Sequence, residues 1–174
     1  MKDFRNTQYA PGIRRNNPGN IRSTPTQWQG KDTAHTSPFE QFISIEHGLR
    51  ALMINAHTLA TRDGYNTIAK LITKWAPPHE NNTQAYINHV CKALQTSPNE
   101  PIAFTMSFYI ALAKAIAQME CGKDYLLIPE SSYTEAYAML PINKKTDAIK
   151  KKVIISSGVF VKTAHPSPIS ICPT

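Results

Sequence analysis

The stretch from Ile110 to Gly122 constrains the fold of this chain most, because it predicts an apolar helix that ends on a carboxylate and a glycine. Apolar residues recur before and within it at the three- and four-residue steps of one buried helical face. They are Phe108, Tyr109, Leu112, Ala115, Ile116 and Met119. Gly122 suits the left-handed position just past a helix C-terminus. We therefore expect a central helix with Leu112, Ile116 and Met119 in the core.

Glu120 falls in the last turn of this predicted helix. The helix dipole there presents partial negative charge, and Met119, Tyr125, Leu126 and Leu127 are close in sequence. Both influences disfavour a charged carboxylate, so we expect Glu120 to hold a proton. A carboxylic acid in that state can protonate a glycosidic oxygen. A glutamate can also end a helix without any chemical role.

Length and composition set limits on the class of protein. A chain of 174 residues can form one domain with a hydrophobic core. No apolar run approaches the ~18 residues needed to cross a membrane, so no span is predicted. The N-terminus lacks the apolar region of a secretory signal, and we expect a protein made in the cytoplasm. Cys91, Cys121 and Cys172 are widely spaced, which predicts free thiols, with Cys91 in apolar packing.

The formal net charge of +7 favours anionic partners: nucleic acid, an acidic membrane surface or the acidic polymers of a bacterial wall. Part of this charge comes from lysines clustered between residues 144 and 152. These lysines are not interleaved with aromatic residues, and no helix-turn-helix or zinc pattern occurs, so specific nucleic-acid binding is not predicted. The six histidines form no metal-ligand pattern, and we predict neither a metal nor another cofactor. His57 and His79 are expected to be packing or surface residues.

The chain before the central helix divides into two regions. Residues 1–43 are rich in Asn, Pro and Gly, which favours short strands or an irregular lobe. Helix start signals follow at Ser44, at Thr67 and at Asn81 or Asn82.

The predicted fold is mainly α, a helical bundle around the central helix with a small irregular or β lobe at the N-terminus. Ser132 and Glu135 have capping-box spacing, which predicts a last helix closed by Pro141. The predicted domain spans residues 1–141, with lobes 1–43 and 44–141. Residues 142–174 form a basic, Pro/Ser-rich extension that contains a β-like run over 153–161.

Six motifs in one order resemble a known family. They are RNNPGNIR at 15–22, WxG at 28–30, FxxF at 39–42, GxRA at 48–51, WAPPxENxTxxY at 75–86 and MECG at 119–122. Together they resemble phage virion-associated lysozyme-like proteins, which also occur in bacterial genomes and as toxin effectors. The resemblance runs from about residue 11 to residue 140. It implies an α+β lysozyme-like fold and cleavage of the peptidoglycan glycan strand.

The resemblance also implies a permuted order and one departure. In bacterial cell-wall glucosaminidases the helix with the catalytic Glu precedes the Asn-rich segment, whereas here Asn16–Ile21 and Trp28 precede Glu120. Catalytic constellations are defined by geometry, so the order alone does not change the chemistry. Cys121 stands where related proteins commonly have Asn, which removes a small polar group beside the expected acid.

Glycan hydrolysis needs an acid and either a second carboxylate or a positioned water. Glu120 is the expected acid. Glu80 precedes a predicted helix N-terminus, where partial positive charge favours a base or electrostatic stabiliser. It can equally be a loop carboxylate that binds the helix amides. Glu46 and Asp32 are weaker candidates, because acidic residues at a helix start or in a turn have structural roles.

Amide, hydroxyl and aromatic side chains near these carboxylates are candidates for sugar binding, since an Asn amide matches an acetamido group. The candidates are Asn16, Asn17, Asn20, Trp28, Asn81, Thr83, Tyr86 and Tyr125. For Asn17 and Asn20 turn geometry is an equal alternative. Trp75 continues the apolar stripe of its helix and is expected in the core.

Two functions from different classes follow from these features. The first is a muramidase or lytic transglycosylase acting on peptidoglycan as a monomer, delivered to the periplasm by a virion, a lysis system or a secretion system. An immunity or inhibitor protein would be its partner in a bacterial host. The second is a non-catalytic peptidoglycan-binding or virion structural protein that keeps only the fold, which the departure at Cys121 favours.

Overall fold

The computed structural model describes residues 1–142. The chain divides into two units, Met1–Leu140 and Pro141–Thr174. The predicted β-like run over 153–161, the lysine cluster of 144–152 and Cys172 lie outside the described residues.

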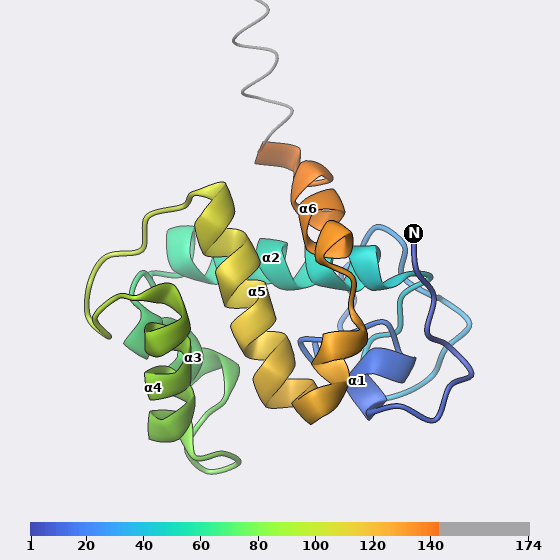
Figure 1. The fold of residues 1–174 in the computed structure, drawn as a ribbon, viewed down its shortest axis with the longest axis horizontal. Coiled ribbons are helices and arrows are strands. Elements are labelled where there is room, and N and C mark those ends of the chain that lie inside the picture. The colour runs from blue at the N-terminus through green and yellow to red at the C-terminus, as the bar shows by residue number, and fades with distance from the viewer. Residues whose placement is uncertain (143–174) are drawn as a thin grey trace, which may run out of the picture. The chain divides into compact units, whose positions relative to one another are not determined.

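The described part of the chain is mainly helical, which confirms the predicted fold class (Figure 1). The elements are α1 (Pro11–Arg14), α2 (Ile45–Thr61), α3 (Ile68–Trp75), α4 (Thr83–Leu94), α5 (Met106–Cys121), the 3-10 helix η1 (Gly122–Leu127) and α6 (Glu130–Ala138). The N-terminal lobe is irregular, with isolated antiparallel bridges between Arg22 and Phe39 and between Lys31 and Phe42. The short helix α1 within it was not predicted.

Three predicted helix start signals are confirmed by hydrogen bonds. The side-chain oxygens of Ser44, Thr67 and Asn82 each accept a backbone N–H of the first turn of α2, α3 and α4. These bonds satisfy donors that a helix N-terminus otherwise leaves free. A Ser, Thr or Asn at the N-cap position therefore fixes where each of these helices begins.

The predicted start of the last helix is wrong. α6 begins at Glu130, directly after Pro129, with no side-chain cap. Ser132 lies inside the helix, and its hydroxyl donates to Oε1 of Glu46 at 2.7 Å. The serine is thus used for a contact between α6 and α2, which local spacing could not reveal.

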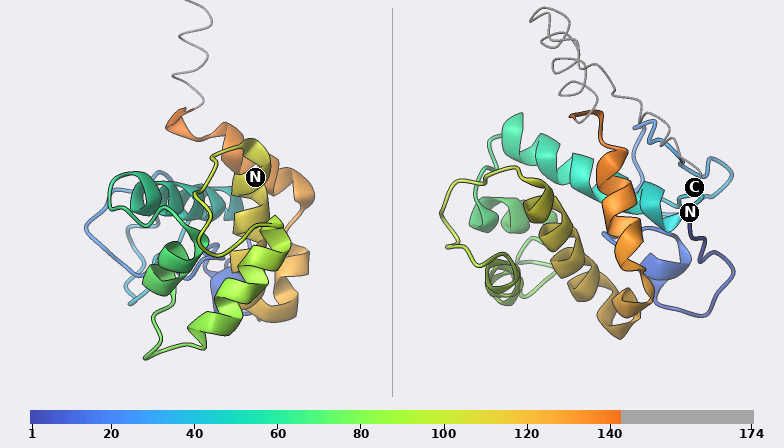
Figure 2. Two further views of the ribbon diagram at one scale, coloured as in Figure 1. Left: turned by 90° about the vertical axis from the view of Figure 1, so that its left-hand side faces the viewer. Right: turned by 45° about the horizontal axis from the view of Figure 1, so that its top comes forward.

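Helix α5 is central, as predicted, and contacts α1, α2, α4, α6 and η1 (Figures 1 and 2). Leu112 and Ile116 are fully buried, but Met119 is 40% exposed, so its predicted core position is wrong. A helix turns 100° per residue, and the buried face drifts along its length. At the end of α5 this face is formed by Ala117 and Cys121.

None of the helices in residues 1–142 has the length and apolar character needed to cross a bilayer. Both cysteines of this part of the chain, Cys91 and Cys121, are free and buried, which confirms the prediction for them.

Candidate active-site cleft

The Asn16–Asn20 turn connects the N-terminal lobe to the end of α5. Asn16 and Asn20 have left-handed backbone conformations, with φ of 52° and 45°, which asparagine tolerates better than most residues. The turn lies directly against α2, because a Cβ atom at Gly48 would overlap the carbonyl oxygen of Asn16. A glycine is therefore required on α2 where this turn crosses it.

Asn16 and Asn17 hold the turn in place rather than facing a ligand. Both are fully buried. The Asn16 amide donates to Asp3 Oδ1 at 2.8 Å and to the Phe42 carbonyl at 2.9 Å. The Asn17 amide donates to the Ile21 and Glu40 carbonyls, and its oxygen accepts from the Ile21 N–H. All their N–H donors are used inside the protein, so their predicted role in substrate binding is corrected to a structural one.

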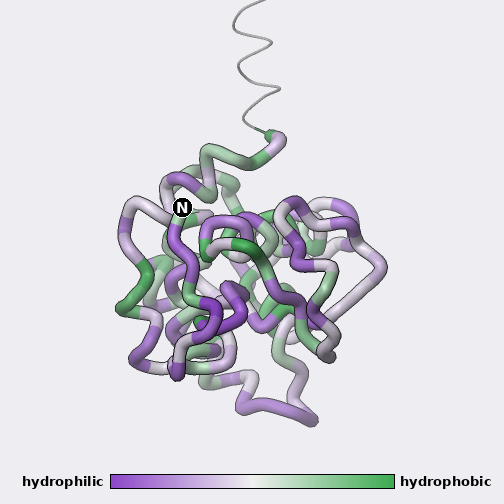
Figure 3. The backbone as a smooth tube through the Cα atoms, turned by 90° about the vertical axis from the view of Figure 1, so that its right-hand side faces the viewer, coloured by the Kyte–Doolittle hydropathy of each residue, from purple (hydrophilic) through white to green (hydrophobic). Residues whose placement is uncertain are grey.

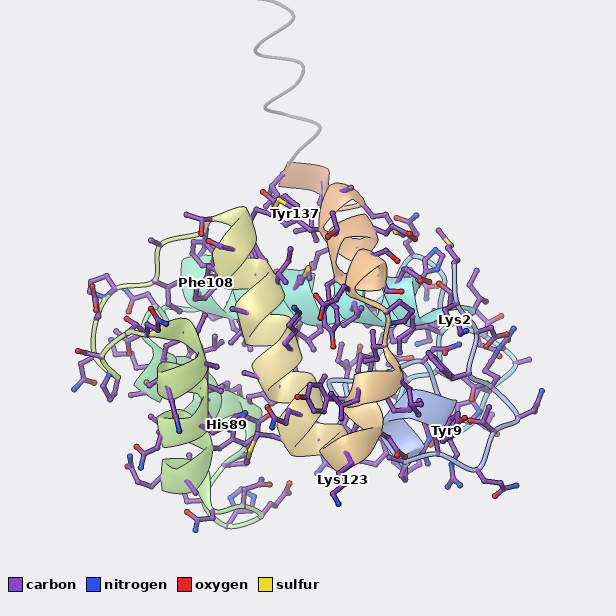
Figure 4. The ribbon with its side chains drawn as sticks, viewed as in Figure 1. Lys2, Tyr9, His89, Phe108, Lys123 and Tyr137 are labelled. Carbon is purple, nitrogen blue, oxygen red and sulfur yellow. The ribbon has the colours of Figure 1, made fainter. Side chains whose placement is uncertain are left out.

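Asn20, the last residue of the turn, points to Glu120. Its amide donates to Oε2 of Glu120 at 2.9 Å, and the hydroxyl of Tyr86 donates to Oε1 at 3.0 Å. Burial, and then the charge of Glu120, raise the pKa of Tyr86, so its hydroxyl keeps its proton. Three segments far apart in the sequence thus meet at one half-buried carboxylate at the end of α5. Figure 4 labels Lys123, three residues further on, at that end.

The surroundings of Glu120 differ from those predicted. Leu126 is 73% exposed and Leu127 is 37% exposed, so they do not enclose the carboxylate in apolar side chains. Polar donors hold it instead. Gly122 does follow the helix with a positive φ of 56°, but its ψ of −139° lies in a region open essentially to glycine alone, outside the predicted left-handed one.

Glu120 lines a cleft of about 530 Å³, a size suited to a small ligand. Its other lining residues are Gly19, Asn20, Ile21, Arg22, Thr24, Thr26, Trp28, Phe39, Asn55, Leu59, Lys74, Trp75, Ala76, Pro77, Glu80 and Asn81. They come from the N-terminal lobe, from α2 and α3, and from the loop before α4. Two indole rings and two carboxylates therefore share one open cleft.

Glu80 lies in the loop between α3 and α4, which is the hydrophilic stretch at the bottom of Figure 3. Its side chain is 45% exposed. Oε2 pairs with Arg22 at 2.8 Å, and Oε1 lies 3.4 Å from His79 Nε2. The arginine belongs to the N-terminal lobe, so this ion pair joins the two lobes at the cleft.

The structure brings together six of the ten predicted site residues. Asn20, Trp28, Glu80, Asn81 and Glu120 line the cleft, and Tyr86 binds Glu120 from behind. Besides Asn16 and Asn17, two residues do not line it. Thr83 is 8% exposed and donates its hydroxyl to the Ala76 carbonyl at 2.6 Å. Tyr125 lies in η1.

Five further polar residues of the cleft were missed, and one residue was assigned wrongly. The missed residues are Arg22, Thr24, Thr26, Asn55 and Lys74. Trp75 also lines the cleft and is half-buried, whereas the apolar stripe of α3 predicted it in the core. The buried face of α3 is formed by Ile68, Leu71 and Ile72, and Trp75 is the last residue of the helix. Trp75 and Glu80 belong to the same WAPPxEN motif, and this shared motif could have indicated that Trp75 lies near the site.

The weaker carboxylate candidates have structural roles. Glu46 is 1% exposed and accepts hydrogen bonds from Ser132 and from the Lys2 N–H. Burial opposes the charge of Glu46, yet these donors outweigh it and lower its pKa. Asp32 accepts from Gln41 and Arg5, and the Gln41 bond is the largest cause that lowers its pKa. Neither lines the cleft.

The cysteine beside Glu120 faces away from the cleft. Cys121 is 5% exposed, and its Sγ lies 3.7 Å from the Pro18 carbonyl. Burial raises the pKa of its thiol to about 12, so it stays neutral. The thiol therefore packs against the Asn16–Asn20 turn and cannot replace a polar group in the cleft.

No group of three or more His, Cys, Asp or Glu side chains within residues 1–142 is placed to hold a metal ion. His57 packs in the helical lobe, where its Nδ1 lies 2.6 Å from the Tyr109 hydroxyl and its ring contacts Phe104. His79 is exposed beside Glu80. Their predicted packing and surface roles are confirmed.

Comparison with known proteins gives one informative relative. No protein-family model matches the chain. Protein P5 of Pseudoalteromonas phage PM2 is 34% identical over 119 residues, a match that covers 66% of this chain and 73% of that protein. The chain is therefore similar, over about two thirds of its length, to a protein of a bacteriophage.

Proposed function

We propose that this chain, which belongs to the family of Protein P5 of Pseudoalteromonas phage PM2, is a peptidoglycan glycosidase that uses Glu120 as its general acid. The observation that carries the proposal is the group of Glu120, Asn20 and Tyr86 at the wall of the cleft. A glutamate placed by two neutral donors beside open space fits the transfer of a proton to a bound ligand.

The contacts of Asn20 and Tyr86 suit a general acid, because Glu120 must be protonated before the reaction and charged after it. The Asn20 amide fixes Oε2. The Tyr86 hydroxyl at Oε1 can donate or accept, so it contacts Glu120 in both states. Since no charged side chain within residues 1–142 is bonded to Glu120, its proton transfer disturbs no ion pair in that part of the chain. The carboxylate is held in one place throughout.

The proposed reaction has two variants that begin with the same step. Glu120 gives its proton to the glycosidic oxygen, and the bond from that oxygen to the anomeric carbon breaks. In hydrolysis, a water attacks the anomeric carbon and loses a proton to Glu80. In lytic transglycosylation, a hydroxyl of the same sugar attacks, and its proton passes to the ionised Glu120. The second variant needs no second carboxylate.

Glu80 fits the role of base or electrostatic stabiliser better than that of acid. It is more exposed than Glu120 and is paired with the cationic Arg22, which stabilises a negative charge. Trp28 and Trp75 offer aromatic faces for sugar rings, and Asn81 offers an amide for an acetamido group.

The protein would act as a monomer on the wall in the periplasm, after delivery by a virion, a lysis system or a secretion system. In a toxin setting an immunity or inhibitor protein would cover the cleft.

A second candidate function is a non-catalytic virion structural or wall-binding protein. It is favoured by one observation: both carboxylates of the cleft already have partners inside the protein, Glu80 with Arg22 and Glu120 with Asn20 and Tyr86. Such a protein would use the cleft to hold a glycan strand without cutting it.

Loss of turbidity of purified peptidoglycan separates the two functions. Wild type is compared with Glu120→Gln and Glu80→Gln, and with Glu135→Gln as a matched control on the exposed face of α6. We expect lysis by wild type and by the control, and none by Glu120→Gln. Walls that are bound but never lysed would favour the structural role. Mass spectrometry of the products distinguishes an anhydro sugar, made by transglycosylation, from a reducing end, made by hydrolysis.

A further inference from the structure

Four charged side chains line the cleft, and they are not equivalent. Glu120 is bonded to two neutral groups, and Glu80 is paired with Arg22. Arg22 also lies over the ring of Phe39, 5.6 Å from its centroid, which fixes the guanidinium against the lobe. Within residues 1–142, Lys74 is the lining cation with no carboxylate oxygen within 4.0 Å of its Nζ.

Lys74 is an exposed residue on the wall of the cleft. It lies in the last turn of α3, one residue before Trp75, whose indole lines the same wall. Arg62, paired with Asp63 at 2.7 Å, is the largest cause that lowers the pKa of that carboxyl, and the charge of Lys74 is the smallest. A lysine in a last helical turn also complements the helix dipole. That role does not require a position in the cleft, and Lys70 on the same helix does not have one.

We propose, as an extension that rests on the function above, that Lys74 binds a carboxylate of the wall glycan, so that the cleft selects a carboxylate-bearing N-acetylated glycan over a neutral one. Neutral chitin presents the same acetamido groups and sugar faces to Asn81, Trp28 and Trp75. Only the wall polymer adds a negative charge. That charge comes from the stem peptide in intact peptidoglycan and from the free lactyl group in strands without peptides.

The test is a binding measurement in the Glu120→Gln background, so that no ligand is consumed. The probes are intact peptidoglycan, strands stripped of stem peptides by an amidase, and soluble chitin oligomers. The substitution Lys74→Ala is compared with Lys70→Ala, which removes the same charge from the same helix outside the cleft. Lys74→Arg keeps the charge and serves as the conservative variant.

We expect Lys74→Ala to weaken binding of a carboxylated probe by about two- to fivefold, the range of an exposed ion pair. Binding of chitin should change much less, and Lys74→Arg should restore most of the loss. A loss confined to intact peptidoglycan names the stem-peptide carboxylate, and a loss on stripped strands names the lactyl carboxylate. Equal losses for Lys74→Ala and Lys70→Ala, or equal losses on chitin, would overturn the inference.

The same measurements separate this inference from the proposed function. If the wild-type chain lyses walls and Lys74→Ala behaves like the control, the glycosidase stands and the role of Lys74 falls. If the wild-type chain neither binds nor lyses any wall preparation, the proposed function falls, and the inference falls with it.

Discussion

The two sides of the cleft carry one carboxylate each but hold it in different ways. Glu120 ends a buried helix and is placed by Asn20, from a turn whose neighbouring amides are fully buried. Glu80 lies in an exposed loop and is placed by an ion pair with Arg22. Breaking a buried hydrogen bond lowers the free energy of unfolding substantially, whereas breaking an exposed ion pair lowers it little. The Glu120 side of the cleft is therefore a fixed scaffold, whereas the Glu80 side can adjust to a ligand.

Among the substitutions proposed here, Glu120→Gln should have the greatest effect, and it tests whether Glu120 is the acid of the cleft. It keeps the shape of the side chain but removes the transferable proton, and general acid catalysis contributes about 100- to 10,000-fold. We expect a loss of lytic activity of that size in the turbidity assay, with an unchanged melting temperature. A smaller loss than that of Glu80→Gln would reverse the roles of the two sides.

The substitution Leu112→Ala tests how much of the scaffold comes from core packing. Leu112 is fully buried on α5, and truncation should lower the free energy of unfolding by about 2–5 kcal/mol. Met119→Ala, on the same helix but 40% exposed, should cost well under ~1 kcal/mol. Chemical denaturation of both variants measures the difference. Equal costs would contradict the orientation of α5.

A pair of substitutions in the turn should separate stability from activity. Asn17→Ala leaves the Ile21 N–H and two buried carbonyls without their partner, at a cost of about 2–4 kcal/mol in the free energy of unfolding. Asn20→Gly removes one half-buried bond without straining the left-handed backbone and should cost about 1 kcal/mol, yet reduce lysis about tenfold through Glu120. Denaturation and turbidity assays on both variants check this, and a stable Asn17→Ala protein would show that the turn is not the scaffold.

The smallest effect is expected on the side of Glu80. Arg22→Ala breaks an ion pair whose side chains are 64% and 45% exposed, so the free energy of unfolding should fall by less than ~1 kcal/mol. Added salt should reduce the difference from wild type further, because exposed pairs are screened. Thermal denaturation at low and high ionic strength measures it. A large, salt-independent loss would mean that this side is as fixed as the other.

The features that local chemistry controls were predictable from the sequence. Ser44, Thr67 and Asn82 fix helix starts because a short oxygen-bearing side chain reaches the first-turn amides from the neighbouring position. Leu112 and Ile116 follow from the period of the helix. The capping box at Ser132 failed, because its hydroxyl binds Glu46, 86 residues away in the chain.

The candidate site also combines features that are visible in the local sequence with contacts that depend on distant segments. The residue types around Glu120, Glu80 and Asn20 were evident in the motifs, but the sequence alone could not tell Asn20 from Asn16 and Asn17. Within one turn, adjacent asparagines point in different directions, and only the packing of that turn on α2 and α5 decides which amide reaches Glu120. Arg22 and Lys74 were missed for the same reason, since no short-range pattern marks a cleft between two lobes.

Short-range hydrogen bonds and the spacing of apolar residues act along the chain, so the sequence predicted the mainly helical class, the starts of α2 and α3, and the burial of Leu112 and Ile116 on α5. It narrowed the start of α4 to Asn81 or Asn82. The tertiary structure alone decided that Asn20 and Tyr86 meet at Glu120, that Asn16 and Asn17 are buried, and that Lys74 lines the cleft without a carboxylate partner among the described residues. Those relations depend on which surfaces of distant segments pack together, and the free energy of that packing is a property of the whole fold.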